Sequence, residues 1–199
     1  MDIKKDFIIV VDETFISTSI KNELSKRVSH SNIYIYRSLS EAKALDYDGA
    51  SYHFIIDMGI SGATPFDIIY WIRTVRDVLP STTVSLMTKN SDWPLLEAIC
   101  HELDIDHLID KSKEENIIDV IFSPKQILTV TERELERAAA LLDCSRTKAD
   151  TLTKLAQYTP QNSIAIDEDK TNAAISKRIG KVVQQVGIQY SALLLWFRK

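Results

Sequence analysis

Four side chains that could take part in chemistry stand where short apolar segments of the chain end: Asp12, Asp57, Thr88 and Lys111. A short apolar run closed by a turn signal is typical of a buried strand in a parallel sheet. Because binding groups collect beyond the carboxyl ends of such strands, we expect the four side chains to meet there. Two carboxylates with a backbone carbonyl form an oxygen site suited to Mg²⁺, and a lysine with a hydroxyl can hold a phosphoryl group arriving on Asp57.

The first half of the chain alternates these segments with helical patterns. Apolar residues at helical spacing, such as Ile68, Ile72 and Val75, indicate a buried helix face. The expected strands are 7–11, 32–36, 52–59, 83–87 and 107–109, and the expected helices lie around 16–28, 38–45, 68–75, 92–103 and 115–122. Five strands alternating with five helices predict an α/β domain with a flavodoxin-like, doubly wound, five-stranded parallel sheet.

The second half shows no strand signals. Residues 123–130 contain a proline and no periodic pattern, so we place a linker there, between a domain over 1–122 and a domain over 131–199. Thr131 followed by Glu134 is typical of a capping box at a helix start. The expected helices are 132–144, 146–157, 171–186 and 190–198, with a loop over 158–170. This pattern predicts a small all-α domain.

Composition and charge narrow the function classes. At 45% apolar residues the 199-residue chain can bury a core, and its longest apolar runs are far below the roughly 18 residues of a membrane span. Residues 1–127 carry 13 basic and 20 acidic side chains, and residues 128–199 carry 11 and 8. A polyanionic partner is therefore expected at the tail. Cys100 and Cys144 are expected to be buried thiols rather than a disulfide, which suits a reducing cytoplasm.

At the strand ends the chain resembles the receiver domain of two-component response regulators, over about residues 5–122. The matching pieces are Val10-Val11-Asp12-Glu13, Ile55-Ile56-Asp57-Met58-Gly59, Leu86-Met87-Thr88 and Ile109-Asp110-Lys111. The resemblance implies that Asp57 is the phosphoacceptor, and that Asp12, Asp57 and the Gly59 carbonyl bind Mg²⁺. It also implies that Thr88 is the switch hydroxyl, that Lys111 binds the phosphoryl group, and that a histidine kinase is a partner.

The chain departs from that family pattern at four positions: Val11, Ser61, Leu108 and Ser112. Val11 replaces one of two adjacent acids, which is expected to weaken Mg²⁺ binding, although Glu13 could partly substitute. Leu108 replaces the aromatic residue that usually moves with the switch hydroxyl. A second interpretation therefore stays open: a receiver-shaped scaffold that is never phosphorylated, in which Asp57 and Lys111 form a buried ion pair.

The tail carries an amphipathic helical pattern over residues 171–186. Ile175, Ile179, Val182 and Val186 fall on one face, and basic and amide side chains fall largely on the other. An ordinary solvated helix face and a helix that enters the major groove of DNA both fit this pattern.

The segment 128–194 resembles the output domain of LuxR/NarL-type regulators, from Leu128-Thr129 through Val186-Gly187-Ile188. The resemblance implies DNA contacts by the recognition helix: Ser176, Lys177, Lys181 and Gln184, with Arg178 nearby. The segment between Ala156 and Thr171 is longer than in that family and carries Asp167-Glu168-Asp169, whose charge would repel phosphate.

Together these features predict an atypical response regulator of the cytoplasm that binds double-stranded DNA as a homodimer. The dimer surface is expected on the first and last receiver helices or on the terminal helix with Trp196 and Phe197. An enzyme is not expected, because the chain shows no nucleophile–base pair and no glycine-rich phosphate loop. The alternative is a protein–protein adaptor in which both halves keep their shape without the chemistry.

Overall fold

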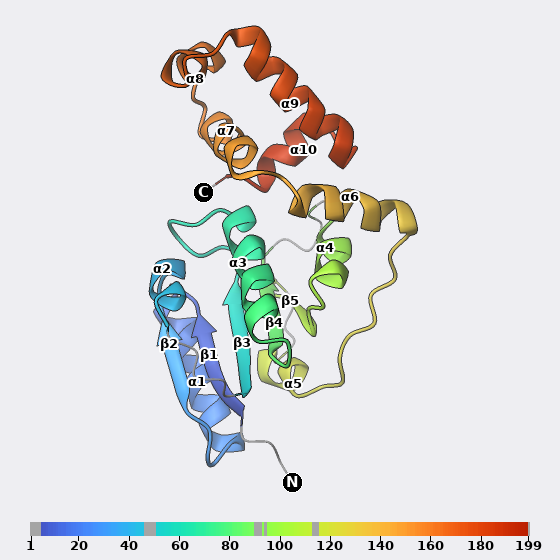
Figure 1. Cartoon of the computed structure of the whole chain (residues 1–199). Coiled ribbons are helices and arrows are strands. Elements are labelled where there is room, and N and C mark those ends of the chain that lie inside the picture. Colours follow the sequence, from blue (N-terminus) through green and yellow to red (C-terminus); the bar gives the residue numbers. More distant parts are fainter. Residues whose placement is uncertain (1–4, 46–50, 90–92, 94, 113–115, 199) are drawn as a thin grey trace.

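The computed structural model describes residues 5–45, 51–89, 93, 95–112 and 116–198, and its first half is built on a parallel sheet. The strands lie in the order β2-β1-β3-β4-β5 (Figure 1). Their bounds are β1 Lys5–Val10, β2 Ile33–Tyr36, β3 Ser51–Asp57, β4 Thr83–Thr88 and β5 His107–Asp110. This order confirms the doubly wound arrangement, in which the chain reverses direction across the sheet between β1 and β3.

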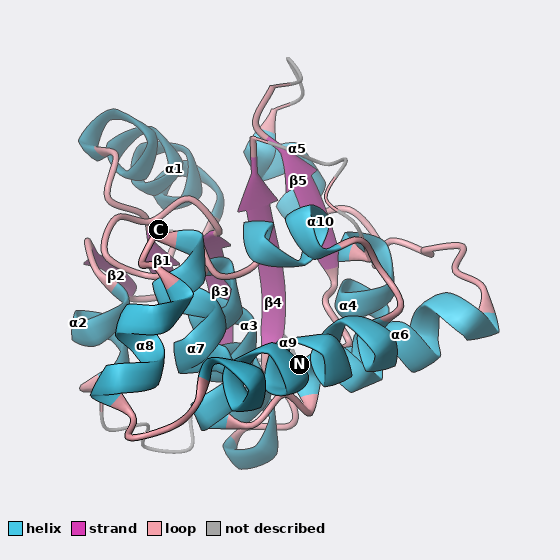
Figure 2. Ribbon diagram, turned by 90° about the horizontal axis from the view of Figure 1, so that it is seen from above, coloured by secondary structure: helices cyan, strands magenta, loops and turns pink. Residues whose placement is uncertain are grey.

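Helices cover both faces of the sheet (Figures 1 and 2). One face packs against α1 Thr14–Arg27 and α5 Ile117–Ile121, and the other packs against α2 Leu39–Lys43, α3 Pro65–Val78 and α4 Leu96–Glu102. Because successive strand residues point to opposite faces, Ile8 and Phe54 belong to one apolar cluster, and Ile9 and Ile55 belong to the other. This two-sided burial explains the continuous apolar runs of the sequence.

Helix starts are set by short polar contacts that the sequence encodes locally. At α3 the Thr64 hydroxyl accepts the Asp67 N–H at 3.0 Å, and the Asp67 carboxylate accepts the Thr64 N–H at 2.9 Å. The capping box predicted at Thr131 and Glu134 is confirmed, with the corresponding contacts at 3.3 and 2.8 Å. Such caps satisfy N–H groups that have no partner within the helix.

The second half is a helical domain, as predicted, with one helix that the sequence analysis missed. Its helices are α6 Glu132–Leu142, α7 Arg146–Ala156, α8 Gln161–Asp167, α9 Asn172–Val186 and α10 Tyr190–Leu195. The loop prediction for 158–170 was wrong, because α8 occupies the middle of that segment and buries Ile164 and Ala165. Two turns of helix with two inward residues are too short to show a period. No helix in the described ranges has the length and apolarity needed to cross a membrane.

The two domains pack directly on one another. Helix α6 lies against α4, and the segment after α10 buries Trp196 and Phe197 completely (Figure 1). The Phe197 ring stacks on Phe66 of α3 with centroids 4.8 Å apart, and the Phe66 N–H donates to the Trp196 carbonyl at 2.9 Å. Trp196 and Phe197, expected as a dimer surface, therefore join the two domains in this structure.

The segment 123–130, between α5 and α6, covers part of the open edge of β5. The Gln126 N–H donates to the Asp106 carbonyl at 3.0 Å, and the Gln126 side-chain oxygen accepts the Leu108 N–H at 2.7 Å. These contacts satisfy backbone groups that an edge strand would otherwise expose.

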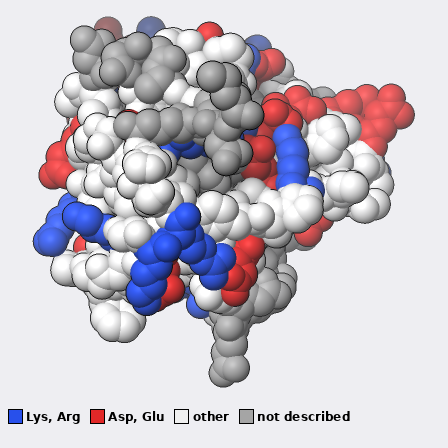
Figure 3. All heavy atoms as spheres, turned by 90° about the horizontal axis from the view of Figure 1, so that it is seen from below, with Lys and Arg blue, Asp and Glu red and all other residues white. Residues whose placement is uncertain are grey.

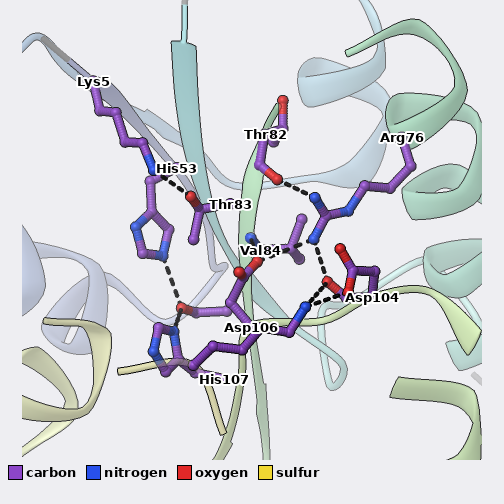
Figure 4. Close-up of polar contacts among 11 residues, drawn as sticks. Lys5, His53, Arg76, Thr82, Thr83, Val84, Asp104, Asp106 and His107 are labelled. Carbon is purple, nitrogen blue, oxygen red and sulfur yellow. Dashed lines mark hydrogen bonds and ion pairs between the residues drawn. The ribbon is translucent and has the colours of Figure 1, made fainter. Parts of the chain in front are cut away.

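A buried polar row crosses β3, β4 and β5 near their amino ends (Figure 4). His53 Nε2 lies 2.8 Å from Ser85 Oγ, which lies 3.1 Å from His107 Nδ1. Burial, with smaller contributions from His107 and Lys5, lowers the pKa of His53 from 6.5 to about 3. Both histidines pack inside the sheet.

The buried His53 predicts a pH-dependent stability. The unfolded chain takes up a proton at the ordinary pKa of 6.5, whereas folded His53 stays neutral down to about pH 3, so acidification favours unfolding. Between these values the wild type should lose up to about 1.4 kcal/mol of unfolding free energy per pH unit relative to His53→Gln. Urea denaturation at several pH values measures this slope. His101→Gln, at an exposed position, is the control, and parallel curves for wild type and His53→Gln would contradict the prediction.

Candidate functional site

The strand ends bring three of the four predicted side chains to one cavity. Asp57 ends β3, Thr88 ends β4, and Lys111 follows β5 directly. These strands are neighbours in the sheet, so their carboxyl ends lie side by side. The cavity has a volume of about 150 Å³, and its lining residues are Glu13, Asp57, Met58, Gly59, Thr88, Lys89, Trp93 and Lys111.

Asp57 forms a buried ion pair at the base of this cavity. The Asp57 side chain is 1% exposed and the Lys111 side chain is 5% exposed, and Lys111 Nζ lies 2.5 Å from Asp57 Oδ2. The second oxygen, Oδ1, accepts the Gly59 N–H at 2.8 Å. The backbone N–H of Lys111 donates to the backbone carbonyl of Thr88 at 2.7 Å, which joins the loop after β5 to the end of β4. Asp57, Thr88 and Lys111 thus line one cavity.

Glu13 and Lys89 complete the charges around the cavity. Glu13 Oε1 lies 3.0 Å from Lys89 Nζ and 3.6 Å from Lys111 Nζ. The hydrogen bond from Lys89 is the largest factor that holds the pKa of Glu13 below its ordinary value. Two acids therefore face two ammonium groups, and the charges of this group balance. Glu13 was considered only as a substitute ligand, and Lys89 was missed although it directly follows Thr88.

Asp12 is not among the lining residues of the cavity, and its carboxylate bonds to Ser61, a residue that departs from the receiver pattern. Its Oδ2 accepts both the N–H of Ser61 at 2.8 Å and the hydroxyl of Ser61 at 2.5 Å. Partial burial acts in the opposite direction, but these two hydrogen bonds hold the pKa of Asp12 below its ordinary value. A proline at position 61 would offer neither donor. The serine therefore fixes the orientation of this carboxylate.

The Mg²⁺ site predicted from Asp12, Asp57 and the Gly59 carbonyl is not assembled in this arrangement. Asp12 is held by Ser61, both Asp57 oxygens have protein donors, and Val11 is a fully buried apolar side chain. Among the described residues, no three His, Cys, Asp or Glu side chains come together as a metal site would need. The donor set in this structure does not fit Mg²⁺.

Trp93 connects the Asp57 cavity to the helical domain. It lines the cavity, and its ring meets the buried Trp196 ring edge-on, with centroids 5.2 Å apart and planes at 69°. This role was not predicted from the sequence. The helix predicted over 92–103 included Trp93 in its first turn, whereas α4 begins at Leu96. A residue of the cavity wall is therefore in direct contact with the residue that follows α10.

Helix α9 presents most of its predicted DNA-contacting residues to the surface. Ile175, Val182 and Val186 are buried, whereas Lys177, Lys181 and Gln184 are exposed. The helix ends at Gly187 with φ of 68°, as predicted. A Cβ at Gly187 would also lie 2.8 Å from Arg137 Nε, so both the backbone and the space favour glycine.

The remaining two predicted contact residues have partners within the helical domain. Arg178 Nη1 lies 2.5 Å from Glu168 Oε2 and 2.7 Å from the Thr151 hydroxyl, which joins α9 to α7 and to the end of α8. Ser176 Oγ accepts from the Gln161 amide at 2.6 Å. Glu168, expected to repel phosphate, is therefore paired with Arg178. Asp167 also lies near a cation, 3.8 Å from Lys154 Nζ.

A receiver-like α/β domain joined to a small helical domain is the architecture of two-domain response regulators, and comparison with solved structures confirms this fold. An RcsB–DNA complex, RcsB being a two-component response regulator, matches at TM-score 0.52 and 19% identity over 98% of this chain and 97% of that one. RcsB from Salmonella enterica serovar Typhimurium, bound to promoter P1flhDC with the phosphomimetic BeF₃⁻, matches at TM-score 0.53 and 18% identity over the same shares. No family model and no curated protein sequence matches the chain.

The buried ion pair predicts unequal effects for the two cavity lysines. Lys111→Met leaves the Asp57 carboxylate buried without its cation, which should lower the free energy of unfolding by about 3–5 kcal/mol. Lys89→Met is the matched control, because Lys89 pairs with Glu13 in solvent and its loss should change stability little. Urea denaturation compares the two variants. Equal destabilisation would show that the Asp57–Lys111 contact does not control the stability of the site.

Proposed function

We propose that this protein is a DNA-binding transcriptional regulator of the response-regulator type. The observation that carries the proposal is the combination of two features in one chain. A cavity at the carboxyl ends of the strands holds Asp57 and Lys111, and helix α9 presents an exposed basic face. The fold that holds both is that of an RcsB–DNA complex. The solved relatives support the fold, and the site residues supply the chemistry. A regulatory role is proposed rather than an enzymatic one, and the cytoplasm is the proposed compartment.

DNA is contacted by the outer face of α9. Lys177 and Lys181 lie one turn apart, so both ammonium groups can reach one phosphate strand while Gln184 faces base edges. Phosphate contacts supply most of the affinity in such complexes, and a single helix with two lysines supplies few of them. A homodimer that doubles the contacts is therefore part of the proposal.

The dimer surface is the face shared by α1 and α5. Phe15 of α1 is 85% exposed, and it borders a small cavity with Ile16, Ile20 and Ile117. An exposed aromatic ring beside apolar neighbours on two helices is a feature of interaction surfaces.

Asp57 is the proposed input. In the phosphoryl transfer, an Asp57 oxygen attacks the phosphorus of a histidine kinase's phosphoimidazole, an O–P bond forms, and the N–P bond breaks with the electron pair staying on the imidazole. Lys111 neutralises the added charge and Thr88 lies at the same cavity. Because Trp93 lines that cavity and contacts Trp196, phosphorylation would alter the packing of α10 on the receiver domain.

The second candidate function is that of a protein–protein adaptor. One observation in the receiver-like domain favours it: the charges at the cavity balance among Glu13, Asp57, Lys89 and Lys111. In that case Asp57 and Lys111 would be a structural ion pair. DNA binding is placed first because α9 presents Lys177, Lys181 and Gln184 together on an exposed face.

The proposed DNA surface predicts a salt signature. Lys181→Ala should weaken binding to duplex DNA and lower the slope of log affinity against log salt by about one for each lost phosphate contact, regardless of sequence. Fluorescence anisotropy across a salt series measures both quantities. The control is Lys43→Ala on α2, which is exposed and belongs neither to α9 nor to the proposed dimer surface. A salt-independent interaction, or equal slopes for both variants, would favour the adaptor.

The proposed input predicts a phosphorylation-linked fluorescence change. Incubation with a small phosphodonor such as acetyl phosphate should add one phosphoryl group to the wild type and none to Asp57→Asn, as measured by intact mass. The same treatment should change tryptophan emission in the wild type and not in Trp93→Phe, because Trp93 lies at the cavity. Absence of the mass change would reject phosphorylation by small donors and leave DNA binding to be judged by its own test.

A further inference from the structure

A second cavity lies at the amino ends of the strands, opposite the carboxyl ends where Asp57 lies. Its volume is about 770 Å³, and it is bounded by the amino ends of the strands and by the ends of α1 and α5. The residues that matter for its chemistry are Lys5, Phe7, His53, Thr83, His107 and Phe122. Figure 3 views the molecule from this end, where lysine and arginine side chains form separate groups with acidic side chains beside some of them. This surface does not resemble the continuous basic surface expected for nucleic acid.

The hydrogen bonds among His53, Ser85 and His107 determine which of their ring nitrogens is left as an acceptor for an occupant of the cavity (Figure 4). His107 Nε2 lies 3.1 Å from the Ser123 carbonyl, which can only accept, so Nε2 carries the proton. With both rings neutral, His107 Nδ1 accepts the Ser85 hydroxyl, and the Ser85 oxygen accepts from His53 Nε2. His53 Nδ1 is then a bare acceptor. It has no hydrogen-bond partner among the described residues, although the His53 side chain is 5% exposed and borders the cavity.

Lys5 supplies a positive charge beside this acceptor. Its ammonium donates to the Thr83 hydroxyl at 2.5 Å, and among the residues that the structure describes it has no acidic partner. The other cations at the cavity are paired: Arg27 with Asp119 at 2.5 Å, and Lys125 with Asp104. The lining acid Asp106 is also committed, because it binds Arg76 at 3.0 Å and the Val84 N–H at 2.8 Å.

Aromatic rings form much of the remaining wall. Phe7 stacks on His53 with centroids 5.5 Å apart, and Phe122 lies 6.3 Å from Phe7 with the Arg27 guanidinium 5.7 Å from its centroid. Phe122 is 47% exposed, so its ring is accessible to an occupant. Rings of this kind favour planar molecules through offset or edge contacts.

We propose that this cavity binds a small planar organic anion that also carries a hydrogen-bond donor. The anionic group pairs with Lys5, the donor bonds to His53 Nδ1, and the ring lies against Phe7 and Phe122. The site is separate from Asp57 and needs no phosphoryl group.

The experiment titrates the full-length protein with three probes that separate the two polar requirements. They are 4-hydroxybenzoate, which has the anion and the donor, benzoate, which lacks the donor, and phenol, which lacks the anion. Imidazole ¹⁵N–¹H correlation spectra follow His53 and His107. We expect saturable shifts with 4-hydroxybenzoate, and roughly ten-fold weaker binding for each of the other two probes.

Variants assign the contacts. Lys5→Gln should weaken 4-hydroxybenzoate binding roughly ten-fold, whereas Lys21→Gln, exposed on α1 and outside the cavity, should not change it. His53→Phe keeps a ring but removes the acceptor, so it should abolish the preference for 4-hydroxybenzoate over benzoate. Asp57→Asn should have no effect, which separates this site from the proposed input. The absence of saturable shifts with 4-hydroxybenzoate, or equal affinities for Lys5→Gln and Lys21→Gln, would overturn the proposal.

Discussion

The contact on which the functional site depends is the ion pair between Asp57 and Lys111, which is almost completely removed from water. Charges in such a place are stable only when each one has its partner and its hydrogen bonds. Asp57 therefore needs β3 to end beside β4 and β5, and it needs the turn to Gly59 to offer an N–H. The burial of the Asp57 carboxylate therefore requires the observed order and register of β3, β4 and β5.

The departures from the receiver pattern are physically connected to one another. Val11 removes an acid from the loop after β1, and Ser61 donates two hydrogen bonds to the remaining acid, Asp12. Glu13 and Lys89 then provide one negative and one positive charge at the rim. The result is a site whose charges are balanced by side chains of the protein itself. An added phosphoryl group would disturb that balance directly, without the contribution of a bound ion.

The coupling between the two halves of the chain rests on aromatic packing. Trp196 and Phe197 have no exposed surface, and they contact Trp93 at the cavity and Phe66 at the start of α3. Burial of two large rings contributes several kcal/mol in general, so the domains do not separate without a compensating interaction. The outer face of α9 is nevertheless exposed. The arrangement thus combines a tightly joined interface with an accessible surface for the proposed DNA contacts.

Local patterns in the sequence by themselves determined the α/β order, the helix starts at Ser38 and Thr131, and the four residues placed at strand ends, because apolar periodicity and capping act over a few neighbouring residues. The tertiary structure alone decided the partners. Arg178 pairs with Glu168 across a turn, Asp12 with Ser61, and Trp93 with Trp196. These contacts join residues that no local period relates, and α8 buries too few residues to show one. A side chain's direction is set by what the fold brings beside it, and this information is absent from the local sequence.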